Sequence, residues 1–446
     1  MTTGYEDRWP TRSRLPSAVV SGWLDRWWPY RSQRTDESGD RPSAECAVLR
    51  WAAGGGMALT GFPSTAPSIS PATAYAVLDA ALTELARLTG IVGHAVHLHP
   101  EAVVGARAAL RGLRRNGQIS AGGMARLIRA ADRWIAISLC RPDDVASVPA
   151  IIGDRGTDDP WRDLEMFAGR TPAAAVVDQA QLLGVAAAVL GPSVADADRT
   201  PLPFRVTDIA SPTTGLALHG ATVVDLSSLW AGPLCGAVLS RAGARVIKVE
   251  STGRPDGARI GDPDFFDWLH RGQESRAVDF TSADGRDQLA HLIDDADIVI
   301  EASRPRALDR LGLSPDRLSH RPGKIWVSIT GGGRSRPMQV NFGDDAAVGG
   351  GLVGWSGDQP VFCADAIADP LSGIMAALAT TAAVEAGGGV LIDLSMTDTA
   401  ASFIAAELDC PGAHAVHTGS AGWVVECSRD RRTRPVVAPS ATGLTC

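Results

Sequence analysis

One carboxylate in this 446-residue chain stands where it could act as a nucleophile. Asp369 and Pro370 open the small-residue run ADPLSGIMAALATTAAVEA, which predicts a helix with Asp369 as its N-cap and Pro370 in its first turn. A structural cap by itself accounts for this pattern. The position also has a chemical interpretation, because the positive end of a helix favours an ionised carboxylate, which can attack an activated acyl group.

Two glycine-containing turns could bring backbone amides to such a reaction. The run Gly331–Gly333 ends the apolar segment KIWVSIT, and the turn DLSSLWAGPLCG carries Gly232 before Pro233. Free amides at the start of a helix there would accept a phosphate or a developing oxyanion. A flexible turn explains the glycine run equally well.

Basic residues are expected to cluster on the loops of the sheet domain in the C-terminal half. They are Lys248, Arg254, Arg259, Arg271, Arg276, Arg304, Arg306 and Arg310. Each alone is typical of a solvated surface charge. Together, on an acidic chain, they favour a site for a polyanion such as a 3′-phospho-ADP group.

Other chemistries have less support. The first strand-to-helix turn lacks the Gly-x-Gly-x-x-Gly fingerprint, although Glu250 ends the second strand where a ribose-binding acid would lie, so a dinucleotide oxidoreductase stays an alternative. No nucleophile elbow, P-loop or His-Glu-x-x-His is present. His94, His97 and His99 lie in HAVHLHP, where a strand would turn His94 away from the other two, so we predict strand histidines and no metal site.

Composition limits the class of protein. Lysine and arginine total 42 against 50 aspartate and glutamate, and this net charge of −8 argues against nucleic acid or anionic lipid as partners. The N-terminus has acids and prolines where a signal peptide needs an apolar run, and no apolar stretch approaches about 20 residues, so we expect a cytoplasmic protein without a membrane segment. Seven widely spaced cysteines without Cys-x-x-Cys predict reduced thiols that fill the interior.

The elements that position these residues change character along the chain. After the connector GPSVADADRTPLPF, apolar strands over 221–226, 245–250, 297–302 and 324–330 alternate with helices. This alternation predicts an α/β fold with a doubly wound parallel sheet, which binds ligands beyond the carboxyl ends of its strands. Upstream, the stretch 118–140 is typical of a glycine loop, a helical turn and a strand, and short helices follow it.

A candidate internal repeat links the two halves of the chain. Residues 51–88 resemble residues 347–386, since each is a glycine-rich stretch followed by an alanine-rich helix, with HAVHLH after the first and VLIDLS after the second. Asp369 in the second copy corresponds to Ser70 in the first. Chance similarity of Gly/Ala-rich sequence is the competing explanation.

Most of the C-terminal half resembles the class III CoA-transferases, the family that includes formyl-CoA and carnitine CoA-transferases and 2-methylacyl-CoA racemases. The matching runs include VVDLSSLWAGPLCGAVLSRAGARVIKVES, RPDGAR, KIWVSITGGG and ADPLSGIMAALATTAAVEAGGGVLIDLSMTDTA. The resemblance implies a Rossmann-like, CoA-binding large domain and a smaller α+β domain, matched by GGMARLIRAADRWIAISLCRPDDVASVPAII.

By this resemblance the family's catalytic aspartate falls on Asp369. It would attack the acyl-CoA thioester to form a mixed anhydride, the released CoA would form an aspartyl-CoA thioester, and a carboxylic acid would accept the CoA. Acyl-CoA is then a substrate, and no permanently bound cofactor is implied. The predicted CoA site combines family positions with Lys248 from the basic group and two glycines of the run: Leu229, Ala231, Gly232, Lys248, Arg259, Arg304, Arg310, Gly331 and Gly332. Gly122 and Gly123 resemble a shortened form of the family's loop over the active site.

The sequence departs from the family pattern in several places. Trp230 replaces the Gln of formyl-CoA transferases, which favours a bulkier or more apolar acyl group. Asp344 stands where racemases have a His, and Gln273–Glu274 replace an expected basic residue. The small-domain sequence precedes the large domain, the reverse of the family's order, which indicates a permuted or fused chain.

We therefore expect six regions: an N-terminal arm (1–45), a degenerate copy of the catalytic-half region (46–110), the small domain (111–200), a linker (201–216), the CoA-binding large domain with Asp369 (217–411) and a C-terminal tail (412–446). The expected protein is a homodimeric CoA-transferase. Two alternatives stay open: a 2-methylacyl-CoA racemase or isomerase that uses Asp369 and Asp344, and a catalytically silent CoA-binding scaffold.

Overall fold

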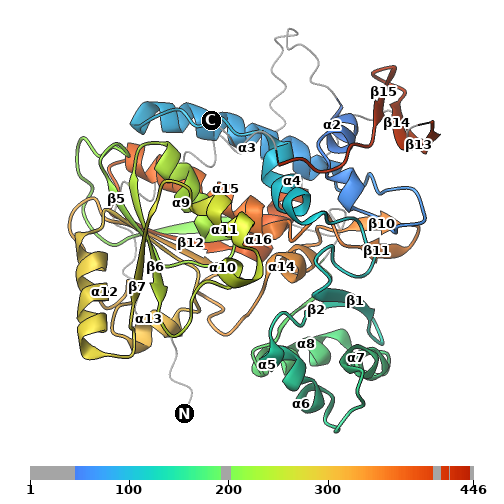
Figure 1. Ribbon diagram of the computed structural model, residues 1–446, viewed down its shortest axis with the longest axis horizontal. Helices are drawn as coiled ribbons and strands as arrows, with labels where there is room; N and C mark the ends of the chain where they lie inside the picture. Colours follow the sequence, from blue (N-terminus) through green and yellow to red (C-terminus); the bar gives the residue numbers. More distant parts are fainter. Residues whose placement is uncertain (1–45, 192–201, 405–412, 421, 442–446) are drawn as a thin grey trace.

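The alternating pattern of the C-terminal half folds into one seven-stranded sheet (Figure 1). The computed structural model describes residues 46–191, 202–404, 413–420 and 422–441, so the expected N-terminal arm lies outside the described residues. The strands of this sheet are β4 (Phe204–Asp208), β5 (Thr222–Asp225), β6 (Arg245–Ser251), β7 (Glu274–Val278), β8 (Ile298–Glu301), β9 (Ile325–Thr330) and β12 (Val390–Ser395).

The strand order is that of a doubly wound nucleotide-binding fold. Across the sheet the strands lie as β4-β12-β9-β8-β5-β6-β7, and every neighbouring pair is parallel except β4 with β12. Counted from β5 in chain order, the six parallel strands are arranged 3-2-1-4-5-6, the Rossmann order. The prediction of an α/β fold with a doubly wound parallel sheet is confirmed.

Helices cover both faces of this sheet. They are α9 (Ala231–Arg241), α10 (Gly257–Gly261), α11 (Pro263–His270), α12 (Ala283–Asp295), α13 (Arg306–Arg310), α14 (Gly343–Gly349), α15 (Ala368–Glu385) and α16 (Met396–Ile404). Val223 joins the core that contains α9 and α15, whereas Val224 joins the core on the α12 side. Consecutive strand residues point to opposite faces, so both faces of β5 are buried, as a parallel sheet requires.

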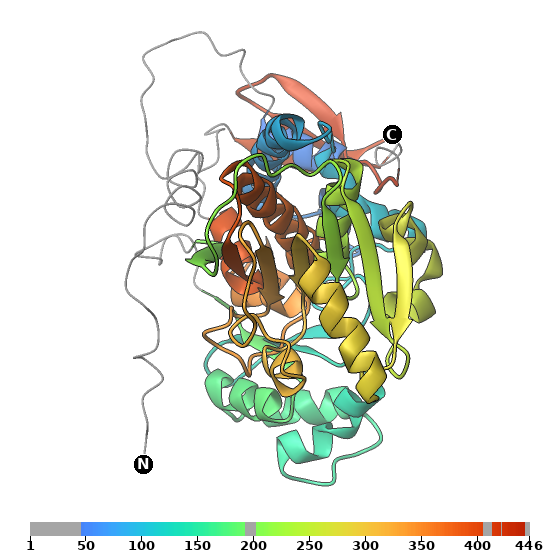
Figure 2. The same cartoon turned by 90° about the vertical axis from the view of Figure 1, so that its left-hand side faces the viewer.

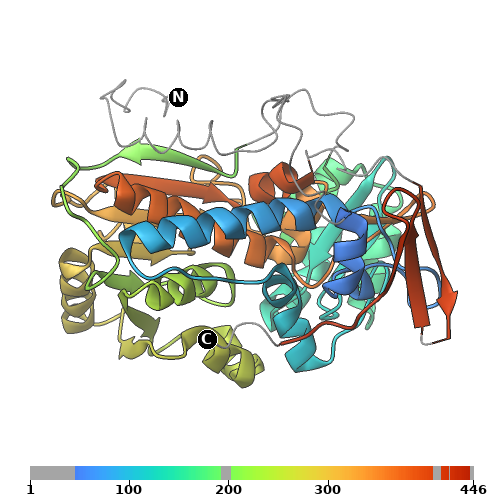
Figure 3. The ribbon, with the colours of Figure 1, turned by 90° about the horizontal axis from the view of Figure 1, so that it is seen from above.

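The segment before the small domain adds a further helical layer. It contains α2 (Ala47–Ala53), the 3₁₀ helix η1 (Met57–Leu59), α3 (Ala72–Val92) and α4 (Pro100–Arg111). α3 lies along α15, as seen from above in Figure 3. The two helices of the candidate internal repeat, α3 and α15, therefore pack against each other, and their common origin stays a prediction.

The histidine segment does not form the expected strand. Residues 93–99 are a loop in which His94 donates its amide hydrogen to the Ala242 carbonyl, with N and O 2.9 Å apart. His99 is the N-cap of α4, and Pro100 occupies the first turn, where proline favours the start of a helix over the continuation of a strand.

The small domain has its own sheet and core and lies below the large sheet in Figure 2. Strands β1 (Ala125–Arg129), β2 (Trp134–Ser138) and β3 (Ala186–Val189) form an antiparallel sheet that packs with α5 (Pro142–Ala146), α6 (Val148–Ile152), α7 (Pro160–Ala168) and α8 (Ala173–Leu182). The helical turn expected within 118–140 is instead the β1–β2 hairpin. Leu127 and Ile128 face different cores, which is the two-residue period of a strand.

Two expected boundaries are wrong. β4 was placed in the linker but forms the edge of the large sheet, antiparallel to β12. The expected tail contains β13 (His414–Gly419), β14 (Gly422–Cys427) and β15 (Arg432–Pro435), an antiparallel sheet that packs on α2 and buries Val425. These short strands carry many polar residues, so their apolar periodicity is faint. The hairpin β10 (Gly354–Ser356) and β11 (Gln359–Val361) completes the described strands.

Within the described ranges, none of the helices combines the length and apolar character needed to cross a bilayer.

Candidate active site

Asp369 lies in the first turn of α15, at the edge of the sheet where the parallel strands end. The helix begins at Ala368, with Ile367 in the cap position, so the expectation that Asp369 is the N-cap is wrong by two positions. The Asp369 amide donates to the Ala366 carbonyl, and Ala366 has a φ of 44°, which starts the helix earlier than Asp369. The Asp369 carboxylate therefore points outward from the first turn, where another group can reach it.

The neighbour that reaches this carboxylate is Gly343, at the start of α14. Its amide donates a hydrogen bond to Asp369, and a Cβ at position 343 would lie 2.5 Å from Asp369 Oδ2. Only a residue without a side chain leaves room for this approach. Two chain segments thus meet at one carboxyl group.

Burial governs the charge of Asp369. It raises the pKa of Asp369 to about 7, and the Arg107 guanidinium acts in the opposite direction. The expectation that the helix end keeps the carboxylate ionised is therefore only partly met, because desolvation outweighs the favourable charges. Asp369 is half-buried, so part of its surface stays open to solvent.

Three further carboxyl groups share this region. Burial and the nearby Asp365 raise the pKa of Asp344 to about 7, against the opposing charge of Arg107. Burial also raises the pKa of Asp345 to about 6, although its carboxylate accepts hydrogen bonds from Asn341 Nδ2 (2.6 Å) and from Ser138 Oγ (2.8 Å). Because these carboxyl groups lie close together, they cannot all be ionised at once, and some of them stay protonated near neutral pH.

Arg107 is the positive charge among these acids, and the sequence analysis missed it. Its Nη1 donates to Asp365 Oδ1 at 2.8 Å, and its guanidinium lies 5.5 Å from the centre of the Trp230 ring. Arg107 belongs to α4, in a segment upstream of the small domain, so no motif or spacing connects it with Asp369. A Cβ at Gly122 would lie 3.9 Å from Arg107 Nη2, which places the predicted glycine loop beside the site.

The turn between β5 and α9 carries three of the predicted CoA positions. Leu229 has a φ of 73° and donates its amide hydrogen to Asp256 Oδ1 at 3.1 Å. Gly232 packs against the Ser227 side chain with no room for a Cβ. The Ala231 carbonyl would lie 2.6 Å from a Cβ at Gly373, which follows Asp369 by one turn of α15. This close packing sets the start of α9 against the first turns of α15, the helix that carries Asp369.

Lys248 supports this turn from inside. Its side chain is completely buried, its Nζ lies 3.1 Å from Asp256 Oδ2, and it also donates to the Ser227 carbonyl. The expectation that Lys248 lies on a loop with the other basic residues is wrong, because it is in the centre of β6. Its charge is satisfied within the fold, so it positions the turn rather than meeting solvent.

The predicted arginines differ in whether they form an ion pair with a carboxylate. Arg259 pairs with Glu250 at 2.5 Å and lies 4.0 Å from the Phe266 ring centre, beside a hollow of about 340 Å³ that Arg271 also lines. Burial and the neighbouring Arg306 lower the pKa of Arg304. Within the described part of the chain, neither Arg304 nor Arg310 has a carboxylate partner, so both stay available to an anionic ligand.

Gly331 and Gly332 pack against side chains of the segment that leads into α14. A Cβ at Gly331 would lie 2.5 Å from Asn341 Oδ1, and Gly332 packs closely against Gln339. Asn341 in turn donates to Asp345, so these glycines act on the carboxyl cluster through a side chain.

Comparison with known proteins finds similarity to one family over part of the chain. Residues 218–422 match the model of CoA-transferase family III. Curated relatives include an acyl-CoA transferase of Fusarium pseudograminearum, 33% identical over 213 residues (42% of this chain and 47% of the relative), and a probable fatty acyl-CoA transferase of Mycobacterium tuberculosis, 38% identical over 140 residues (29% and 36%). The alpha-methylacyl-CoA racemase of Homo sapiens is 32% identical over 195 residues (41% and 49%).

Solved structures give a similar partial overlap. A CAIB/BAIF family protein from Brucella suis is 26% identical, with a TM-score of 0.43 over 49% of this chain and 66% of that chain. The chain spans about a third to a half of the length of the curated relatives named above.

Proposed function

Residues 218–422 belong to CoA-transferase family III, and from this premise we propose that the protein moves CoA between an acyl-CoA thioester and a carboxylic acid, with Asp369 as the nucleophile. The observation that carries this proposal is the place of Asp369. Its half-buried carboxyl group lies at the amino end of α15, and the first turns of this helix pack against the start of α9.

The chemistry needs one carboxylate and no external base. Ionised Asp369 attacks the thioester carbonyl, an Asp369–acyl anhydride forms, and CoA leaves as a thiolate. The thiolate attacks the Asp369 carbonyl of the anhydride, which releases the first carboxylic acid and forms an aspartyl-CoA thioester. The acceptor carboxylate then attacks this thioester, CoA leaves again, and its attack on the new acyl carbonyl frees Asp369 and completes the transfer.

Charged groups around Asp369 support these steps. The Gly343 amide donates to the carboxyl group that must lose its proton, and Arg107 stabilises negative charge in a region of low solvent access. Arg304 and Arg310 are the proposed partners of the CoA phosphates, since guanidinium groups bind phosphate in two-pronged geometry. Leu229, Ala231 and Gly232 form the proposed wall against the pantetheine arm, and Arg259 borders the hollow described above.

A second function has a specific observation in its favour. Asp344 has a pKa of about 7 and belongs to the same cluster, so it could exchange a proton with the carbon next to a thioester carbonyl. A relative at 32% identity is named as an alpha-methylacyl-CoA racemase. Isomerisation of a branched acyl-CoA in deuterium oxide, without any acceptor acid, would incorporate deuterium at that carbon, whereas transfer would not.

A transfer assay tests the leading proposal. Purified protein is incubated with a panel of acyl-CoAs and free carboxylic acids, and new acyl-CoA is measured by chromatography. We expect transfer by the wild type, a loss of about 10³-fold or more in Asp369→Asn, and unchanged transfer in the matched variant Asp358→Asn, whose carboxylate is exposed in the β10–β11 turn. Binding of acyl-CoA without transfer or deuterium exchange would favour the silent scaffold.

A further inference from the structure

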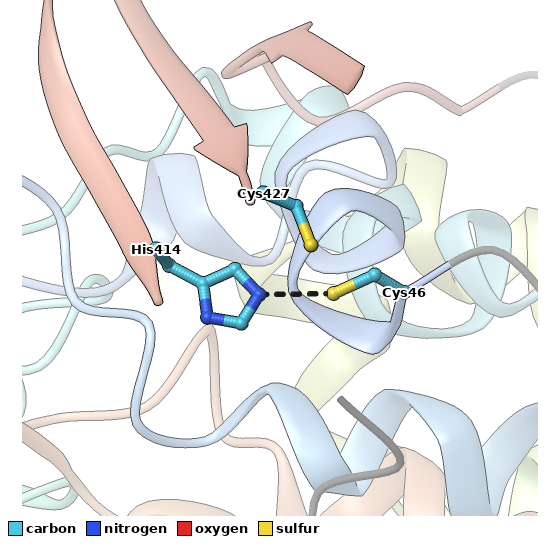
Figure 4. Close-up of side chains that lie close together, drawn as sticks. All are labelled: Cys46, His414 and Cys427. Carbon is cyan, nitrogen blue, oxygen red and sulfur yellow. Dashed lines mark hydrogen bonds between the residues drawn. The ribbon is translucent and has the colours of Figure 1, made fainter. Parts of the chain in front are cut away.

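Cys46, His414 and Cys427 lie together although they come from opposite ends of the sequence (Figure 4). Their ligand atoms all lie within 4.8 Å of one another, and Cys46 Sγ is 3.1 Å from His414 Nε2. Both cysteines are buried, and His414 is half-buried. We propose that these three residues bind a zinc ion that fastens α2 to the sheet of β13, β14 and β15.

The ligand types and spacing fit zinc. Thiolate sulfur and imidazole nitrogen are its usual protein ligands, at about 2.3 Å and about 2.0 Å. Tetrahedral angles at those lengths separate two ligand atoms by about 3.6 to 3.8 Å. The Cys46–His414 separation of 3.1 Å is shorter than this value, and no separation exceeds 4.8 Å, so small side-chain movements are sufficient to admit the ion.

Charge balance also favours zinc in this buried place. When Zn²⁺ binds, it displaces one proton from each of the two thiols to solvent, and the imidazole binds in its neutral form. The two thiolate charges then cancel the charge of the ion. A neutral complex avoids the large cost of burying an unpaired charge.

The backbone already presents the three ligands to one point. His414 and Cys427 are directly opposite each other in the β13–β14 pair, so their side chains lie on one face of the sheet. Cys46 is the N-cap residue of α2, which packs on that face. The Cys46 amide donates to Asp430 Oδ2 at 2.9 Å, which fixes the third ligand from the neighbouring turn.

The proposed role of this zinc is structural. No element that carries these three residues also carries Asp369, Arg107 or the other acids of the cluster. The described ligands leave one position of a tetrahedron for a water molecule or a further ligand. The proposal replaces the expectation of no metal, which rested on local spacing along the chain and so could not detect residues at its two ends.

Metal analysis of the full-length protein tests the site. The protein is purified with reductant, incubated with Zn²⁺, dialysed and analysed by mass spectrometry of metals. We expect about one zinc per chain in the wild type and in Cys140→Ser, which removes an exposed cysteine elsewhere, and a loss of at least about tenfold in Cys46→Ser and Cys427→Ser. Equal zinc content in all four proteins, or none in the wild type, would overturn the proposal.

Cobalt provides a readout that does not depend on how well the variants fold. Wild-type protein loaded with Co²⁺ should show the thiolate-to-cobalt absorption and the intense visible bands of a tetrahedral site, and added Zn²⁺ should remove both. A spectrum of octahedral, oxygen-bound Co²⁺ would contradict the proposal. So would a Cys46–Cys427 disulfide found by peptide mass spectrometry in protein kept under reductant.

Discussion

At the scale of single residues, the charge of Asp369 depends on a balance between burial and one guanidinium. Burial moves the pKa of Asp369 towards neutrality, and the Arg107 guanidinium opposes this shift. A nucleophile that becomes ionised near the working pH reacts well, because a carboxylate with a higher pKa is also a stronger nucleophile. Arg107 is therefore placed to set the pH at which the site becomes active.

Replacement of this guanidinium should change the pH profile of transfer. Because the proposed nucleophile, Asp369, would attack in its ionised form, kcat/KM should rise as the pH increases through about 7 and level off above it. Arg107→Met removes the charge that lowers the pKa of Asp369, so the rise should move by about one unit or more to higher pH, with activity at pH 7 reduced at least about fivefold.

The control for this prediction is Arg114→Met, which removes an exposed arginine near the end of the same helix. Its pH profile should match the wild type. If the pH profile of kcat/KM for Arg107→Met has the wild-type midpoint and only a lower maximum, Arg107 does not control the ionisation of Asp369.

Arg107 also shows which kind of contact cannot be predicted from a sequence pattern. The signature around Asp369 is local, since Asp-Pro before a small-residue helix can be recognised within a few positions. The interaction of Arg107 with Asp365 joins residues 258 positions apart. No period or motif in a single sequence encodes such a contact, so it becomes visible only in the folded chain.

At the scale of elements, the contact between α14 and α15 holds the proposed nucleophile, Asp369, in place. Gly343 touches both the Asp369 carboxylate and the Ala366 carbonyl. A methyl group at this position would push Asp369 away, and misplacement of a reacting group by about 1 Å can cost about 10²-fold in rate. Gly343→Ala should therefore lower kcat by about 10²-fold, as measured by the transfer assay at saturating acyl-CoA.

Gly261→Ala is the matched control for this change. A Cβ at Gly261, which ends α10, meets no atom within 4 Å and needs no left-handed backbone. Wild-type kcat in Gly343→Ala, with a normal melting temperature, would show that the Asp369–Gly343 contact is not needed for the reaction.

The buried ion pair under the β5–α9 turn should matter for stability. Lys248→Met leaves Asp256 without its positive partner in the interior, which should lower the free energy of unfolding by on the order of 3 to 5 kcal/mol. Arg245→Gln removes a pair with Glu274 in which both side chains are about half exposed, and should cost much less, because solvent screens such a pair. Urea unfolding of both variants would measure the two effects, and similar losses would contradict this ranking.

Elements with strong apolar periodicity were the predictable part of the fold. The parallel strands β5, β6, β8 and β9 coincide with the expected segments, because each is a short run buried on both faces. β4 and the strands β13–β15 were missed, since an edge strand and a small exposed sheet bury only one face and alternate with polar residues.

At the scale of the whole molecule, the site is assembled from three regions of the chain. Asp369 comes from the large sheet domain, Arg107 from the segment before the small domain, and Ser138, which binds Asp345, from the small domain. The small domain is also joined to α14 through the hydrogen bond from the Gly191 amide to the Val348 carbonyl. The fold therefore brings three regions that are far apart in the sequence to one place.

The proposed site therefore extends upstream of the family match, which begins at residue 218. The large domain supplies the proposed nucleophile and the proposed CoA contacts. The upstream segment supplies Arg107, the guanidinium that lowers the pKa of Asp369. A protein truncated to residues 218–422 would lack Arg107, and with it the charge that lowers the pKa of the proposed nucleophile.

The central claim is that Asp369 becomes covalently acylated during turnover. Wild-type protein is incubated with an acyl-CoA in the presence of hydroxylamine, which converts an aspartyl anhydride or aspartyl thioester into a stable hydroxamate, and the digested peptides are analysed by mass spectrometry. We predict a hydroxamate on Asp369, formed only when acyl-CoA is present, and none on Asp358. Turnover of acyl-CoA with Asp369 unmodified, or with the hydroxamate on another carboxylate, would contradict the account.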